Sequence, residues 1–149
     1  MTNVSLIVGT TMGTALKVSK TIKSVLDQNG YDVKLIDSYK KNGLDLISQS
    51  LLIICTSNTG MGDIPKNLKP FYEDITDPLH QGLKDKCYSI VNLGDSSFVR
   101  FAQAGYTLDT ALQKTGAKRL GDIHVMDAAI VDDYESDAHK WAISWMNLL

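Results

Sequence analysis

The feature that most constrains the fold of this chain is a regular alternation of two patterns. Short apolar runs rich in β-branched residues alternate with segments whose apolar residues recur at helical spacing. The strand-like runs are 4–8, 33–36, 51–55, 88–93 and 123–126, and the helix-like segments are 15–26, 44–48, 65–75, 101–112 and 138–149. No linker or repeat interrupts them. The alternation predicts a single α/β domain over residues 1–149, a doubly wound five-stranded parallel sheet with helices on both faces.

Local signals support this division of the chain. The run Leu51–Cys55 is continuously apolar, which is typical of a central parallel strand covered on both faces. Gly30 is placed to end the first helix as a C-terminal cap, and Pro65 is placed to begin the helix that extends to about Ile75.

Composition excludes several classes of protein. With 149 residues, 44% hydrophobic content and a net charge of -2, the chain is too apolar and too weakly charged to be disordered. The same net charge provides no positive field that would capture nucleic acid. No apolar run approaches the roughly 20 residues of a membrane span, and the N-terminal residues do not form a targeting segment, so we expect a cytoplasmic protein that does not enter a membrane. Cys55 and Cys87 have no disulfide-framework or CxxC spacing, which indicates reduced thiols.

Acidic residues gather near the C-terminus. The stretch from Asp122 to Asp137 contains six acids and no lysine or arginine. It is either a solvated loop and helix start, or a surface that attracts a basic partner.

Three loops follow strands one, three and four, where ligands collect in sheets of this type. The first, Gly9–Ala15, places glycines and threonines before a helix, which leaves backbone N–H groups free to bind an anion. It lacks both the P-loop lysine and the GxGxxG fingerprint, so it suits a single phosphate monoester. The alternative is an ordinary strand-to-helix turn capped by Thr10 or Thr14.

The second and third loops suit a flat ligand. In the second, Thr56–Pro65, Gly60 and Gly62 allow the backbone to approach a ring closely. In the third, Asn92–Phe98, a strand ends in glycine and small polar residues before an aromatic. That ring either stacks on a planar heterocycle or covers the end of the strand as a core residue.

Together, Gly9-Thr10-Thr11-Met12-Gly13-Thr14, Thr56–Pro65 and Leu93–Phe98 resemble the FMN-binding loops of the flavodoxin family in order and spacing. The resemblance covers the whole chain and is closest to short-chain flavodoxins of the MioC and YqcA type. The second and third loops are also similar to those in the FMN domains of sulfite reductase and cytochrome P450 reductase. Flavodoxins are among the standard examples of ligand binding at the carboxyl ends of parallel strands, so this resemblance and the expected position of the ligand are not independent.

The resemblance implies a sheet of order 2-1-3-4-5 and an FMN cofactor. It implies an electron carrier, not an enzyme, that passes single electrons from an NADPH-dependent flavodoxin reductase to an acceptor redox enzyme through transient contacts. We expect the protein to be a monomer.

The resemblance also assigns the FMN contacts. The first loop contributes Thr10, Thr11, Met12, Gly13, Thr14 and Ala15; the second contributes Thr56, Ser57, Asn58, Thr59, Gly60, Met61 and Gly62; the third contributes Asn92, Leu93, Gly94, Asp95, Phe98 and Phe101. Phe98 matches the aromatic that stacks on the flavin. Met12 and Ala15 stand where hydroxyl residues are frequent, and Thr59 stands where many flavodoxins place a second aromatic.

Two other functions remain open on the same fold: an FMN-dependent NAD(P)H:quinone or flavin reductase, and an interaction protein without flavin. A phospho-receiver domain is excluded, because Val8-Gly9-Thr10 and Cys55-Thr56 stand where its acids would be. His80, His124 and His139 have no metal-ligand spacing, so we expect no metal site. Because the chain is nearly neutral, we expect a milder depression of the second flavin potential than in strongly acidic flavodoxins.

Overall fold

The computed structural model describes residues 2–41, 43, 51–58, 62–77, 83–100 and 102–149. Its elements are β1 (Thr2–Gly9), α1 (Thr14–Gln28), β2 (Tyr31–Ile36), β3 (Leu51–Ser57), the 3-10 helix η2 (Lys66–Leu68), α2 (Lys69–Thr76), β4 (Cys87–Gly94), α3 (Gln103–Lys114), β5 (Lys118–Arg119), β6 (His124–Asp127) and α4 (Tyr134–Met146). The expected short helix at 44–48 lies outside the described residues.

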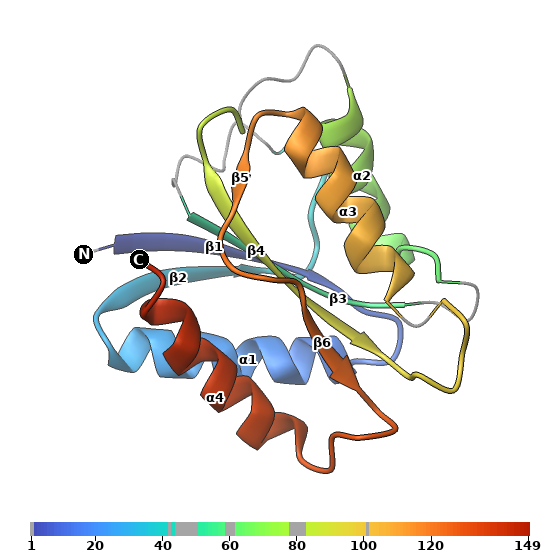
Figure 1. The fold of residues 1–149 in the computed structure, drawn as a ribbon. Helices are drawn as coiled ribbons and strands as arrows, with labels where there is room; N and C mark the ends of the chain where they lie inside the picture. The colour runs from blue at the N-terminus through green and yellow to red at the C-terminus, as the bar shows by residue number, and fades with distance from the viewer. Residues whose placement is uncertain (1, 42, 44–50, 59–61, 78–82, 101) are drawn as a thin grey trace.

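The sheet is parallel throughout, in the order β2-β1-β3-β4, and its last position is shared by β5 and β6 (Figure 1). Both of these pair with β4, β5 at its beginning and β6 at its end. The expected order is therefore confirmed, but the fifth strand is divided in two. Between the halves, Gly121 adopts a φ of +73°, a left-handed conformation that interrupts an extended strand.

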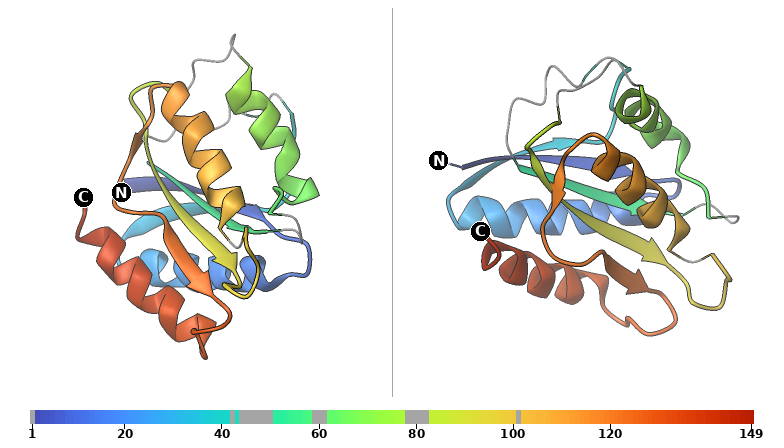
Figure 2. Two further views of the ribbon diagram at one scale, coloured as in Figure 1. Left: turned by 45° about the vertical axis from the view of Figure 1, so that its right-hand side comes forward. Right: turned by 45° about the horizontal axis from the view of Figure 1, so that its top comes forward.

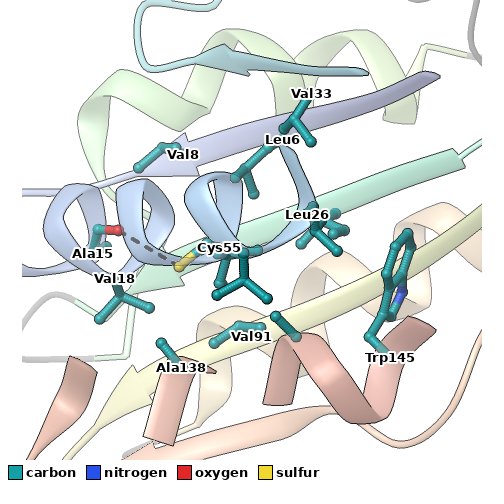
Figure 3. Packing of buried hydrophobic residues seen from close by; sticks show 14 of the residues in the cluster. Leu6, Val8, Ala15, Val18, Leu26, Val33, Cys55, Val91, Ala138 and Trp145 are labelled. Atoms are coloured by element: carbon teal, nitrogen blue, oxygen red, sulfur yellow. Dashed lines mark hydrogen bonds between the residues drawn. The ribbon is translucent and has the colours of Figure 1, made fainter. Parts of the chain in front are cut away.

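Helices cover both faces of the sheet, as predicted (Figures 1 and 2). α1 and α4 pack side by side on one face, and α2 and α3 on the other. Under α1 and α4, a buried cluster joins Leu26 and Trp145 from the helices to Leu6, Cys55 and other strand residues (Figure 3). Each sheet face is thus sealed by its own apolar layer, which leaves the strand ends and their loops as the places for a site.

The helix expected from Pro65 begins later than predicted. Residues Lys66–Leu68 form a 3-10 turn, and the α-helix starts at Lys69 with Pro70 in its first turn. Proline has no N–H, and the first turn of a helix is where that loss is tolerated. Pro70, rather than Pro65, therefore marks the start of the α-helix.

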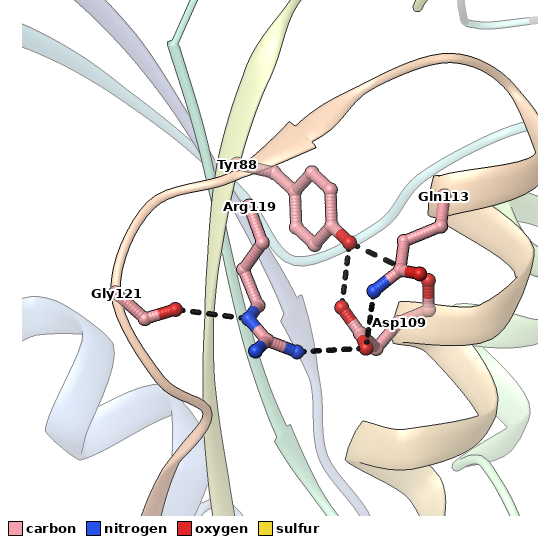
Figure 4. A network of polar contacts seen from close by, with 5 residues as sticks. All are labelled: Tyr88, Asp109, Gln113, Arg119 and Gly121. Carbon is pink, nitrogen blue, oxygen red and sulfur yellow. Dashed lines mark hydrogen bonds and ion pairs between the residues drawn. The ribbon is translucent and has the colours of Figure 1, made fainter.

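A polar network joins α3 to the sheet near the beginning of β4 (Figure 4). Tyr88 donates its hydroxyl to Asp109 Oδ1 at 2.5 Å, while Arg119 Nη1 and Gln113 Nε2 donate to Asp109 Oδ2 at 2.8 and 2.9 Å. Burial, together with this carboxylate, raises the pKa of Tyr88. The network lies at the amino end of the strands and stabilises the end of the molecule opposite the three loops.

In the described part of the chain, every helix is too short or too polar to span a bilayer. The same part of the chain contains no group of three or more His, Cys, Asp or Glu side chains placed to hold a metal ion. Cys55 and Cys87 are free thiols, the first buried and the second half-buried.

Candidate cofactor site

The first loop leads into α1 and exposes the amino end of that helix. Gly13 is the N-cap residue, with a φ of +89° that favours glycine. In this fully described stretch the first helical bond runs from Lys17 N–H to Gly13 O at 3.1 Å, so the N–H groups of Thr14, Ala15 and Leu16 have no acceptor within the helix. Such groups, aligned with the helix dipole, form a binding site for an anion.

Hydrogen bonds from outside the helix hold the first loop in shape. Thr10 Oγ1 accepts from Gly13 N–H at 2.9 Å, and Thr10 N–H donates to Asn67 Oδ1 at 2.9 Å. Asn67, on η2, also donates to the carbonyls of Val8 at 3.0 Å and Asp37 at 3.1 Å. Thr10 therefore closes the turn before α1 but does not cap the helix, whose N-cap Gly13 makes no side-chain hydrogen bond. The predicted anion cradle at this helix start stays a prediction. The role of Asn67 has no signal in the sequence beyond a polar residue after Pro65.

Hydroxyl groups near the helix start come from Thr11 and Thr14, which are exposed. Thr11 Oγ1 lies 3.5 Å from Ser57 Oγ, so the first and second loops meet here. Met12 is 93% exposed and adds no polar group. The donor set is neutral, which suits one phosphate monoester bound mainly by backbone N–H groups.

A cleft of about 260 Å³ opens beside this cradle. It is lined by Thr14, Ser57, Asn58, Leu93, Gly94, Asp95, Phe98, Arg100, Ala128 and Tyr134. Thr14 belongs to the helix start and to the cleft, so the anion cradle and the cleft are continuous. Phe98 is 61% exposed and presents its ring at the cleft instead of covering the end of the strand in the core.

Three lining residues were not predicted from the sequence. Arg100 follows the third loop, while Ala128 and Tyr134 follow β6. The latter two were detectable in principle, because the strand at 123–126 ends at the same edge of the sheet as the others. Burial, with the carboxylates of Asp95 and Asp127 nearby, raises the pKa of Tyr134, so its hydroxyl remains a neutral donor.

Other predicted residues lie behind the cleft or outside the description. Ala15, Thr56 and Asn92 are fully buried. A Cβ on Gly62 would lie 2.8 Å from Gln103 Cβ and 2.9 Å from Arg100 Cβ, so Gly62 permits close packing against the residues that follow the third loop. Thr59, Gly60, Met61 and Phe101 lie outside the described residues.

Carboxylates fix the third loop. Asp127 Oδ1 accepts from Ser96 N–H at 2.8 Å and Ala129 N–H at 2.9 Å, and Asp95 Oδ1 accepts from Ser97 N–H at 2.9 Å. The hydrogen bond from Ser96 lowers the pKa of Asp127.

The acidic stretch at 122–137 therefore divides into two groups. Asp127 holds the third loop, Asp133 caps α4 by accepting from Ser136 N–H at 3.1 Å, and Asp137 lies 2.7 Å from His124 Nε2. Asp122, Asp132 and Glu135 remain exposed.

The sheet order, the exposed amino end of α1 and the adjoining cleft define a doubly wound α/β protein with a ligand cleft at the carboxyl ends of its strands. The chain belongs to the flavodoxin family, whose sequence profile, described as Flavodoxin, matches residues 6–141.

Individual relatives agree with this assignment. The chain is 33% identical over 152 residues to "Flavodoxin YqcA" of Pectobacterium carotovorum subsp. carotovorum, covering 100% of this chain and 98% of that protein. It is 30% identical over 152 residues to "Protein MioC" of Escherichia coli (strain K12), covering 100% and 99%. Among solved structures, a cysteine-to-serine mutant of flavodoxin from Pseudomonas aeruginosa matches with a TM-score of 0.90 and 26% identity, covering 99% of this chain and 98% of that one.

Flavodoxins bind FMN and carry electrons between redox partners, so this protein is an FMN-binding electron-transfer protein and not an enzyme. The predicted family, cofactor and function are confirmed. Neither the quinone or flavin reductase nor the flavin-free interaction protein has support in these similarities.

Proposed function

We propose that the FMN phosphate binds at the first turn of α1. The N–H groups of Thr14, Ala15 and Leu16 and the hydroxyls of Thr11 and Thr14 are its donors. The absence of a basic side chain from Gly9–Ala15 suits a monoester whose charge is balanced by the helix dipole and several N–H groups. Thr10 acts indirectly, because its hydroxyl holds Gly13 in the left-handed conformation that opens the helix.

The flavin ring then occupies the adjoining cleft. Bound FMN supplies a ring system that accepts and releases electrons. Phe98 offers an aromatic face for stacking, Leu93 and Gly94 form a wall that excludes water, and Tyr134 offers a hydroxyl donor. The observation that carries this proposal is Thr14, which belongs to both the helix start and the cleft.

The partners proposed are an NADPH-dependent flavodoxin reductase as donor and a redox enzyme as acceptor. Around the cleft, the loops expose large apolar side chains, among them Met12 at 93%, Val99 at 98% and Ile130 at 75%. Exposed acids, including Asp132 and Glu135, flank them. An apolar contact surface bordered by acids suits brief, salt-sensitive association of a monomer with basic cytoplasmic partners.

Absorption spectroscopy of the purified protein tests the cofactor and its site together. We expect FMN to give a bound-flavin spectrum with quenched fluorescence, and Thr14→Val to weaken binding by removing a phosphate donor. Failure of the protein to bind added FMN would refute the proposed site.

Assays with NADPH test the proposed partners. NADPH should be consumed only when a flavodoxin reductase is added. Consumption by the protein alone would instead favour a reductase enzyme.

A further inference from the structure

Helix α3 begins without a side-chain cap of its own, and two asparagines take that role, one directly after β3 and one near the end of β4. Its N-cap residue, Ala102, makes no side-chain hydrogen bond to the helix. Instead, Ala104 N–H donates to Asn58 Oδ1 at 3.1 Å and Gly105 N–H donates to Asn92 Oδ1 at 2.9 Å. The first N–H groups of a helix need acceptors from outside it, so both amides serve as caps supplied from a distance in sequence.

The two asparagines are also bonded to each other and to the chain around the cleft. Asn92 Nδ2 lies 3.3 Å from Asn58 Oδ1, 3.3 Å from the carbonyl of Thr56 and 3.2 Å from that of Leu93. Asn58 Nδ2 donates to the carbonyl of Arg100 at 3.4 Å. The second loop, the end of β4, the segment after the third loop and the start of α3 are thereby linked in one polar network.

The sequence of α3 is adapted to this network. A Cβ on Gly105 would lie 2.7 Å from Asn92 Oδ1 and 3.1 Å from Asn92 Cβ. Glycine is unfavourable inside a helix compared with alanine, so its use here follows from the close approach of the Asn92 amide.

Asn92 does not reach the cleft itself. Its side chain is 0% exposed and is absent from the cleft lining, whereas Asn58, Leu93 and Arg100, all bonded to the network, belong to that lining. We propose that Asn58 and Asn92 are positioning residues of the FMN site: by capping α3 they hold the second loop against the segment after the third loop and set the width of the cleft. This inference rests on the proposed placement of the flavin in the cleft.

A pair of variants on β4 tests the proposal. Asn92→Ala breaks the link between β4 and α3 at the cleft, and Tyr88→Phe removes the hydrogen bond between the same two elements at the opposite end. We expect Asn92→Ala to weaken FMN binding about tenfold and to shift the visible circular dichroism of the bound flavin. Tyr88→Phe should change the dissociation constant by less than about twofold. Equal FMN affinities in the two variants would overturn the proposal.

Amide hydrogen exchange tests the caps without FMN, so it separates this inference from the proposed function. In FMN-free protein, the amide of Gly105 should exchange faster in Asn92→Ala, and that of Ala104 faster in Asn58→Ala. Asn58→Asp keeps the acceptor oxygen and should preserve slow exchange at Ala104. Wild-type exchange rates in both alanine variants would refute the capping role, whether or not the protein binds FMN.

Two further variants test the proposal if Asn92→Ala does not fold. Gly105→Ala displaces the Asn92 amide, and Asn58→Ala removes the more exposed cap together with its bonds to Asn92 and Arg100. Both should weaken FMN binding and speed exchange in the first turn of α3. Unchanged FMN affinity in both would refute the positioning role.

Discussion

At the scale of single residues, Phe98 is expected to contribute to FMN binding but little to the stability of the fold. Its ring lines the cleft but is 61% exposed, so it contributes little to the core. Phe98→Ala should weaken FMN binding roughly tenfold, since stacking on a nucleotide base is worth about 1–3 kcal/mol. The free energy of unfolding of FMN-free protein should change by less than about 0.5 kcal/mol.

Fluorescence titration with FMN measures the affinity, and urea unfolding measures the stability. Val99→Ala is the matched control, because Val99 is adjacent, 98% exposed and outside the cleft lining. Equal affinities in the two variants would mean that Phe98 does not stack on the flavin.

Cys55 illustrates how burial removes reactivity. Its Sγ lies 3.6 Å from the carbonyl of Ala15 inside the core, and burial raises its pKa to about 12. The neutral thiol is therefore maintained at any pH well below that value, and only a thiolate attacks a disulfide reagent. At pH 8 native protein should titrate one fast thiol, Cys87, whereas unfolded protein should titrate two.

A Cys87→Ser variant is the control for this assay and should show no fast thiol in the native state. Rapid reaction of two thiols in native wild-type protein would contradict the burial of Cys55.

Residue types and spacing were sufficient to predict the positions of the first and third loops. They did not predict which distant side chains form hydrogen bonds with those loops. Gly13 and Phe98 could be placed because a glycine before a helix and an aromatic after a strand end are local signals in the sequence. Asn67 was not predicted, and Asn92 was predicted as an FMN contact but not as a cap of α3, since their amides bond to residues distant in sequence. Nothing in one sequence specifies such a pairing.

At the scale of elements, η2 supports the first loop through Asn67. Asn67→Ala removes one acceptor and two donor contacts, so we expect about 2 kcal/mol less stability in FMN-free protein. FMN affinity should fall as well, because Thr10 loses the bond that fixes its backbone. Urea unfolding and FMN titration measure the two effects.

Asn29→Ala is the matched control for Asn67→Ala. Asn29 donates to the carbonyl of Val25 at 2.7 Å at the other end of α1, so its loss should lower stability and leave FMN affinity unchanged. Parallel losses of affinity in both variants would show that η2 has no special relation to the first loop.

Element boundaries show the limits of periodicity. Helical spacing indicated α2 but not its first residue. The α-helix begins at Lys69, with Pro70 in its first turn, and not directly after Pro65. The strand at 123–126 appeared as β6, whereas β5 is only two residues long and gives no alternating pattern to detect. Its pairing comes from the position of Arg119 beside Tyr88, a contact between distant parts of the chain.

At the scale of the whole molecule, a net charge of -2 is too small to shift the flavin reduction potential strongly. Charges close to the cleft therefore have the larger effect on that potential. Asp95 and Arg100 both line it, so the nearest acid is partly offset by a base. A cation near the ring stabilises the negative charge that a flavin gains on full reduction. These local charges give a physical basis for the prediction of a mildly depressed second potential.

Arg100→Gln should therefore lower the second reduction potential. A charge at about 8 Å and an effective dielectric constant of about 40 contributes roughly 1 kcal/mol, or about 40 mV for one electron. Lys69→Gln changes the net charge equally, but Lys69 lines a groove beside α2 and not the cleft, so its effect should be much smaller. Spectroelectrochemistry on both variants decides between local and overall charge. Equal shifts in the two variants would show that net charge controls the potential. An unchanged potential in Arg100→Gln would show that Arg100 does not lie near the flavin.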